Sequence, residues 1–204
     1  MGNAYIGVRG AKRSGKDTFT NYLVSELVIH LISRSIVRTS FAKNLRLAVA
    51  QIFGFDPEFV FSDEFKPFVT HVYPLPGRHM FDEEKPLTGR ELLQYFGSEV
   101  CREMDNDCWA RAPFTEVERE HDNALCFITD LRFPNEADQL LQHHSFIIKV
   151  ERPGFDGDGH ISERALDDFE DDDFIVDNSG TEEDLANEAK KIAAVIAERL
   201  TRGD

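Results

Sequence analysis

A glycine-rich stretch near the start of the chain combines residue types and a spacing that suit phosphate binding. Residues 10–18 read G-A-K-R-S-G-K-D-T, follow an apolar run over residues 4–8 and precede an amphipathic run over residues 19–31. Glycine permits the tight turns that aim several backbone N–H groups at one point, and a helix N-terminus adds further N–H groups and a positive dipole end. A strand, a loop and a helix in this order form a nest for the phosphates of a nucleoside triphosphate.

The side chains of this loop predict phosphoryl transfer, which needs positioning and charge neutralisation more than covalent chemistry. Lys16 supplies a mobile cation, and Asp17 stands where Ser or Thr is more usual. The alternative, a glycine-rich turn with surface cations, would crowd three basic residues on one loop with no anion to relieve their repulsion. We expect the triphosphate to contact Gly10, Lys12, Arg13, Ser14, Gly15, Lys16, Asp17 and Thr18.

Short apolar runs separated by helical patterns predict an α/β fold with a parallel sheet. The expected strands are Ala4–Arg9, Ser35–Ser40, Ala124–Thr129, Phe146–Val150 and Phe174–Val176. The expected helices cover about residues 17–31, 45–53, 88–104, 109–120 and 181–200, and a further helix begins at Pro134. Ligands of such sheets bind beyond the carboxyl ends of the strands, so candidate site residues should directly follow strands.

Two more polar clusters follow predicted strands. Asp130 and Arg132 come after the third strand, and Arg152 comes after the fourth. Because Mg²⁺ prefers oxygen ligands, Asp17 and Asp130 are candidates to hold it directly or through water. Planar guanidinium groups suit phosphate oxygens. The alternatives stay open: Asp130 could cap the next helix or pair with Arg132, and either arginine could form a structural salt bridge.

A second substrate would need its own site, and candidates follow the second strand. Arg46 could hold a monophosphate, and Arg90 and Gln94 lie four residues apart on one face of a predicted helix. Arg102 and Trp109 come shortly afterwards. A glutamine and a planar aromatic could read and stack a base, although the residues alone favour a solvent-facing glutamine and a core tryptophan.

Composition limits the function further. The 204-residue chain has a net charge of −15, which disfavours stable binding to nucleic acid. A chain of this length should form a single domain over residues 1–204. Because it has no apolar run of membrane-spanning length and begins directly in a predicted strand, we expect it in the cytoplasm. Three cysteines without metal-type spacing should stay reduced, and the acidic stretch at residues 156–173 should be a solvated face or loop. Two irregular stretches, residues 56–86 and 154–159, suit an insert and a lid.

Taken together, these motifs make the chain resemble the phage deoxynucleoside monophosphate kinase family, relatives of the nucleoside monophosphate kinases. The D-L-R-F-P-N-E run at residues 130–136 is more specific than a generic phosphate loop. The segments that carry the resemblance, in the order of the family, are Gly10–Thr18, Ser40–Ala42, Thr88–Gly97, Trp109, Thr129–Glu136, Glu151–Pro153, Ser162–Glu163 and Asp177–Thr181.

The resemblance implies transfer of the γ-phosphoryl group of ATP, with Mg²⁺, to a deoxynucleoside 5′-monophosphate, which gives the diphosphate for phage DNA synthesis in the host cytoplasm. It implies a P-loop three-layer core with a five-stranded parallel sheet flanked by helices, and a homodimer. It also implies an acceptor-binding insert at about residues 41–120 and a lid at about residues 153–173. The expected catalytic residues are then Lys16, Arg132, Arg152 and Asp130, and the expected acceptor-binding residues are Arg46, Arg90, Gln94, Arg102, Trp109 and Arg132.

Two other interpretations remain. The same core serves other small-molecule kinases, such as dephospho-coenzyme A kinase-like enzymes or nucleoside kinases. A nucleotide-hydrolysing switch protein is less favoured, because the sequence offers no obvious partner-binding arm or apolar interface helix.

Overall fold

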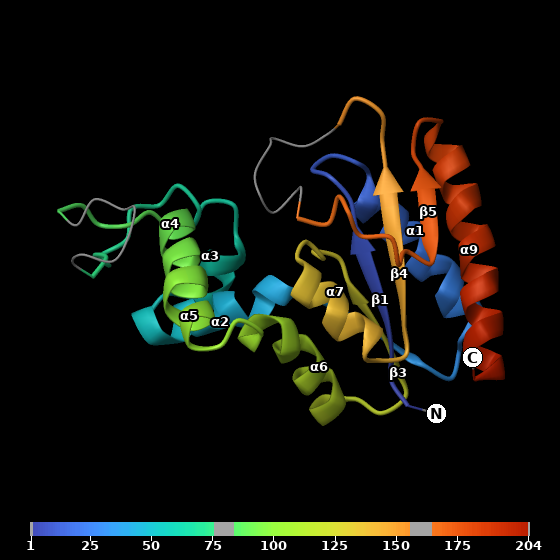
Figure 1. Ribbon diagram of the computed structural model, residues 1–204, viewed down its shortest axis with the longest axis horizontal. Coiled ribbons are helices and arrows are strands. Elements are labelled where there is room, and N and C mark those ends of the chain that lie inside the picture. The colour runs from blue at the N-terminus through green and yellow to red at the C-terminus, as the bar shows by residue number, and fades with distance from the viewer. Residues whose placement is uncertain (1, 76–83, 156–164, 204) are drawn as a thin grey trace. The chain divides into compact units, whose positions relative to one another are not determined.

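The computed structural model describes residues 2–75, 84–155 and 165–203 (Figure 1). The chain divides into two compact units. Unit 1 comprises residues 1–40 and 114–204, and unit 2 comprises residues 41–113. Within the described part of the chain, no helix is both long enough and apolar enough to cross a membrane.

A parallel five-stranded sheet forms the centre of unit 1, which confirms the fold class predicted from the sequence (Figure 1). The strands run in the spatial order β2-β3-β1-β4-β5, and every pair of neighbours is parallel. Their bounds differ from the predicted ones by no more than about one residue at either end. The strands are β1 (Ala4–Arg9), β2 (Ser35–Thr39), β3 (Ala124–Ile128), β4 (Ser145–Glu151) and β5 (Phe174–Asp177).

Helices cover both faces of this sheet and make three layers (Figure 1). Alternate residues of β1 point to opposite faces. Ile6 and Val8 pack into a core shared with α1 (Lys16–His30) and α9 (Glu182–Arg202). On the other face the ring of Tyr5 lies 4.8 Å from that of Phe114, in α6 (Cys108–Glu120).

The helix α7 (Pro134–Leu141) also covers this second face, and it approaches β1 closely. A Cβ atom on Gly7 would lie 2.3 Å from Cδ1 of Leu140 and 3.2 Å from Cδ2 of Leu131. Glycine at this central position therefore lets α7 lie flat against the strand. Leu131 in the same contact also packs the residues just before α7 against β1.

Unit 2 is helical and has a core of its own. Its elements are α2 (Phe41–Phe53), α3 (Pro57–Phe61), α4 (Gly89–Gln94), the π-helix η1 (Tyr95–Cys101), α5 (Arg102–Met104) and the first turns of α6. The core gathers Val49, Ala50, Val60, Phe65, Leu87, Leu92 and Tyr95. The single helix predicted over residues 88–104 is helical throughout, but its middle is a π-helix.

Candidate active site

The loop between β1 and α1 has the backbone geometry of an anion-binding nest. Gly10 and Gly15 have φ angles of 155° and 91°, and Arg13 between them has 68°. A Cβ atom on Gly10 would lie 2.5 Å from the carbonyl oxygen of Val150, so no larger residue fits beside β4. Successive N–H groups in such alternating conformations point into one concavity.

Two polar features of this loop suit a phosphate ligand. Gly15 is the N-cap of α1 and provides no side-chain cap, so the first N–H groups of the helix are not capped from that position. The hydroxyl of Ser14 is buried and has no hydrogen-bond partner among the described residues. Since buried polar groups are rarely left unsatisfied, the loop fits a ligand rich in acceptor oxygens, such as a triphosphate.

Lys16 and Asp17 follow this nest at the start of α1. The Lys16 side chain is only 18 % exposed, and its Nζ lies 3.5 Å from a carboxylate oxygen of Asp17. The Asp17 side chain is 77 % exposed and open to ligands from solvent. The pair therefore offers a partly desolvated cation and an accessible carboxylate at one helix end.

Asp130 and Arg132 follow β3, the neighbour of β1 on one side. The buried carboxylate of Glu136 accepts hydrogen bonds from the N–H groups of Arg132 and Phe133, at 2.9 and 3.1 Å. Leu131 is buried. These contacts hold the backbone of Arg132 and leave its side chain exposed, while Asp130 is half-buried.

Arg152 follows β4, the neighbour of β1 on the other side. It is exposed, and its guanidinium carbon lies 4.6 Å from the centre of the Phe155 ring. The glycine-rich loop, Arg132 and Arg152 thus follow three adjacent parallel strands, β1, β3 and β4. The convergence of the three predicted clusters on one edge of the sheet is confirmed by the strand order, whereas the roles of the individual residues stay predictions.

All the predicted acceptor residues except Arg132 belong to unit 2. Arg46 in α2 donates from Nη1 to the carbonyl oxygens of Val60 and Phe61, both at 3.2 Å, and its guanidinium carbon lies 5.5 Å from the Phe61 ring centre. Arg90 and Gln94 are exposed on α4. Two open polar side chains and a braced arginine are the kind of group that can bind a phosphate or a base edge.

Trp109 belongs to α6 but is tied to the π-helix. Its indole N–H donates to the carbonyl oxygen of Gly97 at 3.0 Å, and the backbone N–H of Arg102 donates to the same oxygen. The ring is half-buried and lies 6.5 Å from the ring of Phe96. Trp109 is therefore not a fully buried core residue, and it holds the segment that carries Arg102.

Sequence reasoning gave no role to Arg9, which lies directly before the loop. Its guanidinium forms a buried ion pair with Asp172, whose side chain is 4 % exposed, and donates to the carbonyl oxygens of Leu166 at 2.8 Å and Phe169 at 3.1 Å. Most of the acidic residues described around Asp172 are exposed, as expected for a solvated stretch, but Asp172 is not. The signal in the sequence was an arginine at the end of an otherwise apolar strand.

The metal candidates Asp17 and Asp130 are not part of a larger cluster of metal-ligating side chains among the described residues. Within residues 2–75, 84–155 and 165–203, no cluster of three or more His, Cys, Asp or Glu side chains could hold a metal ion. A single carboxylate such as Asp17 fits Mg²⁺ only where phosphate oxygens and water complete the shell, as Mg²⁺ commonly prefers.

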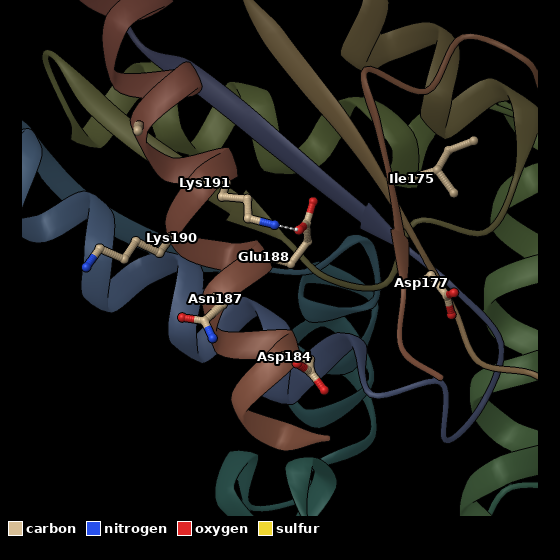
Figure 2. A pocket seen from close by; sticks show the side chains of 8 residues that line it. Ile175, Asp177, Asp184, Asn187, Glu188, Lys190 and Lys191 are labelled. Carbon is tan, nitrogen blue, oxygen red and sulfur yellow. Dashed lines mark hydrogen bonds and ion pairs between the residues drawn. The ribbon is translucent and has the colours of Figure 1, made fainter. Parts of the chain in front are cut away.

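A separate cavity of about 820 Å³ lies beside β5 and α9 (Figure 2). Its lining includes Asp177, Asp184 and Glu188, and Glu188 forms a 2.8 Å ion pair with Lys191. These three carboxylates outnumber the two lysines of the lining, Lys190 and Lys191, which disfavours a phosphate ligand, so we do not assign this cavity to the substrates.

The parallel sheet, the glycine-rich nest after its central strand and the arginines at the same edge are the arrangement expected of an α/β phosphotransferase. The family model described as "Deoxynucleotide monophosphate kinase" matches residues 28–189, and the chain belongs to this family. It is therefore an enzyme, a nucleotide kinase. The match begins after residues 10–18, so the assignment of the loop rests on the loop's own geometry.

Two further similarities accompany this match. The chain is 28% identical over 192 residues to the "Putative deoxynucleotide monophosphate kinase" of Acanthamoeba polyphaga mimivirus, with 88% of this chain and 91% of that protein covered. Among solved structures, shikimate kinase from Acinetobacter baumannii in complex with shikimate aligns with a TM-score of 0.43 and 12% identity, over 98% of this chain and 94% of its own.

Proposed function

We propose that this enzyme transfers the γ-phosphoryl group of ATP to a deoxynucleoside 5′-monophosphate and releases the two diphosphates. The observation that carries the proposal is the loop itself. There the buried hydroxyl of Ser14, which has no hydrogen-bond partner among the described residues, lies beside an α1 N-terminus that Gly15 leaves uncapped. Family membership supports the choice of acceptor.

In this proposal the loop binds the donor. N–H groups of residues 10–16 hold the β- and γ-phosphates, and Lys16 neutralises charge as the γ-phosphoryl group moves. Arg132 and Arg152, which follow the strands on either side of β1, stabilise the same group. Mg²⁺, when bound, would neutralise phosphate oxygens, with Asp17 and Asp130 as the residues that hold it.

Unit 2 is proposed to bind the acceptor. Arg46, Arg90 and Arg102 would hold its phosphate, while Gln94 and Trp109 would contact the base. The exposure of Arg90 and Gln94 on α4 supports this assignment. The proposed lid over residues 153–173 falls partly outside the described residues, because the structure describes only 153–155 and 165–173 of it.

The biological setting is also a proposal. A deoxynucleoside monophosphate kinase of this family would supply precursors for phage DNA synthesis in the cytoplasm of the host, and it would act as a homodimer. Support comes from the motif resemblance and the family match. Light scattering of the purified enzyme tests the dimer: a monomer mass at assay concentration would reject it.

A panel of acceptors tests the activity. The purified enzyme is mixed with ATP and Mg²⁺ and with each deoxynucleoside monophosphate, a ribonucleoside monophosphate, a nucleoside or dephospho-coenzyme A, and diphosphates are measured by chromatography. We expect one deoxynucleoside diphosphate for each ADP formed. Activity only on nucleosides or dephospho-coenzyme A would replace the proposal with another small-molecule kinase. Phosphate release that no acceptor changes would indicate a nucleotide-hydrolysing switch.

A further inference from the structure

Asn178, which follows β5, contacts the loop at residues 10–18, although the two are far apart in the sequence. Its side-chain amide donates a 2.7 Å hydrogen bond to the carbonyl oxygen of Ser14, across 164 positions of the chain. It is half-buried. Neither the donor chemistry nor the acceptor chemistry described above uses this residue.

The contact fixes the direction of a backbone N–H group. The peptide bond between Ser14 and Gly15 is trans, because the described chain contains no cis peptide bond. In a planar trans peptide the C=O and the following N–H point in opposite directions. When Asn178 holds the carbonyl of Ser14, the N–H of Gly15 must point away from Asn178.

Gly15 and Asn178 also fit each other sterically. A Cβ atom on Gly15 would lie 2.2 Å from Nδ2 of Asn178, and the φ angle of Gly15 is 91°. A residue with a side chain would both strain the backbone and displace the amide. Because Gly15, the N-cap of α1, has no side chain, it leaves the space that the Asn178 amide occupies.

Asn178 is itself held in place by its neighbours. Its backbone N–H donates to the carbonyl oxygen of Glu151, the last residue of β4, at 2.7 Å. The N–H of Ser179 donates to the Asp177 side chain at 2.9 Å, which forms a tight turn. Just beyond, Thr181 and Asp184 close a capping box at the start of α9. An amide anchored in this way can orient the loop before any ligand arrives.

We propose that Asn178 is a positioning residue that orients the Ser14–Gly15 peptide so that the N–H of Gly15 donates to a phosphate oxygen of the bound donor. This inference rests on the proposed function, because it assumes that the loop binds the donor. The amide is required rather than a carboxylate. An Asp side chain would face the Ser14 carbonyl oxygen with lone pairs and add a negative charge beside the polyphosphate.

The test compares Asn178→Ala and Asn178→Asp with Asn187→Ala and Asn187→Asp, which change an exposed asparagine of α9 in the same ways. Donor affinity is measured by calorimetry with ATP and Mg²⁺, and the KM of each substrate by steady-state kinetics. Loss of one hydrogen bond should weaken the donor about tenfold in Asn178→Ala. The added charge should weaken it about hundredfold in Asn178→Asp. The acceptor KM and the Asn187 variants should stay near wild type.

A structural role is separated by the melting temperature and by the ¹⁵N–¹H signal of Gly15. We expect this signal to shift on donor binding in the wild type and to shift much less in Asn178→Ala. Asn178→Ser, a milder change, serves if the Ala and Asp variants do not fold. Wild-type donor affinity in the folded variants, or donor and acceptor KM values that rise equally with falling stability, would overturn the inference while the proposed function stands. A wild type that binds no triphosphate would overturn both.

Discussion

At the scale of single residues, a substitution of Lys16 should impair phosphoryl transfer without affecting folding. Its side chain is mostly buried beside the loop, and its nearest ion-pair contact, with Asp17, is a loose 3.5 Å. Lys16→Ala should therefore lower kcat/KM by about 10²–10³-fold, because the charge it offsets builds up only during transfer. Lys190→Ala, which removes an exposed lysine of α9, is the matched control and should leave both activity and melting temperature unchanged. Near-normal turnover of Lys16→Ala would contradict the assignment.

Arg132 and Glu136 should behave in opposite ways. The Arg132 side chain is exposed, whereas Glu136 is buried and accepts two backbone N–H groups before α7. Arg132→Ala should lower turnover about 10²-fold at unchanged stability. Glu136→Gln should lower the free energy of unfolding by about 1–3 kcal/mol, because one N–H acceptor is weakened in a buried place. Urea unfolding and steady-state rates measured on both variants check this. An Arg132→Ala enzyme that loses stability but keeps its rate would identify Arg132 as a structural ion-pair partner.

Residue-level prediction from sequence succeeded where chemistry is local in the chain. The loop at residues 10–18 could be predicted because its glycines and cations are contiguous and follow an apolar run. The partners of Arg9 and Asn178 could not be predicted. Asp172 and Ser14 lie more than 160 positions away from them, and the local sequence pattern does not indicate which distant residue is the partner.

At the scale of an element, the capping box of α4 should make unit 2 sensitive to acid. The backbone N–H and the hydroxyl of Thr88 both donate to the Glu91 carboxylate at 2.7 Å, and they lower the pKa of Glu91 below its ordinary 4.5. The native state therefore binds a proton less readily than the unfolded chain. This stabilisation is complete above the unfolded pKa and disappears as the pH falls through the folded pKa.

The acid sensitivity can be followed through Trp109, the only tryptophan of the chain, which lies in unit 2. We expect the urea midpoint of its fluorescence to fall between about pH 5 and pH 3 in the wild type. In Glu91→Gln the midpoint should be lower at pH 7 and should change less over this range. Parallel pH profiles for the two proteins would show that ionisation of Glu91 contributes no pH-dependent stability.

Helices and strands could be predicted from the sequence where burial alone sets their pattern of apolar residues. The strands of a parallel sheet are covered on both faces, so runs such as residues 124–128 are continuously apolar and easy to locate. The π-helix was not predicted, because its hydrogen bonding depends on tertiary contacts. A Cβ atom on Gly97 would lie 2.8 Å from Leu45, and the Gly97 carbonyl accepts from Trp109.

At the scale of the whole molecule, the Arg9–Asp172 pair ties the end of β1 to the long connection between β4 and β5. Breaking a buried pair by removing one partner costs about 3–5 kcal/mol, whereas replacing both with apolar residues is often near neutral. Arg9→Met should therefore destabilise strongly. Adding Asp172→Leu should recover only part of the loss, because the carbonyl oxygens of Leu166 and Phe169 still lack their guanidinium donor. Unfolding in urea of the two single variants and the double variant gives the coupling free energy. Additive losses would show that the pair is not coupled.

The two units should also respond to different ligands. Each has its own core, and the donor loop lies in unit 1 while the proposed acceptor residues other than Arg132 lie in unit 2. A non-hydrolysable ATP analogue with Mg²⁺ should slow hydrogen exchange at amides of residues 10–20, because N–H groups bound to phosphate are protected. A deoxynucleoside monophosphate added alone should slow exchange over residues 89–104 instead. Exchange mass spectrometry resolves both segments. If the monophosphate protected only the loop of unit 1, the acceptor residues proposed in unit 2 would be wrong and the two substrates would share one phosphate nest.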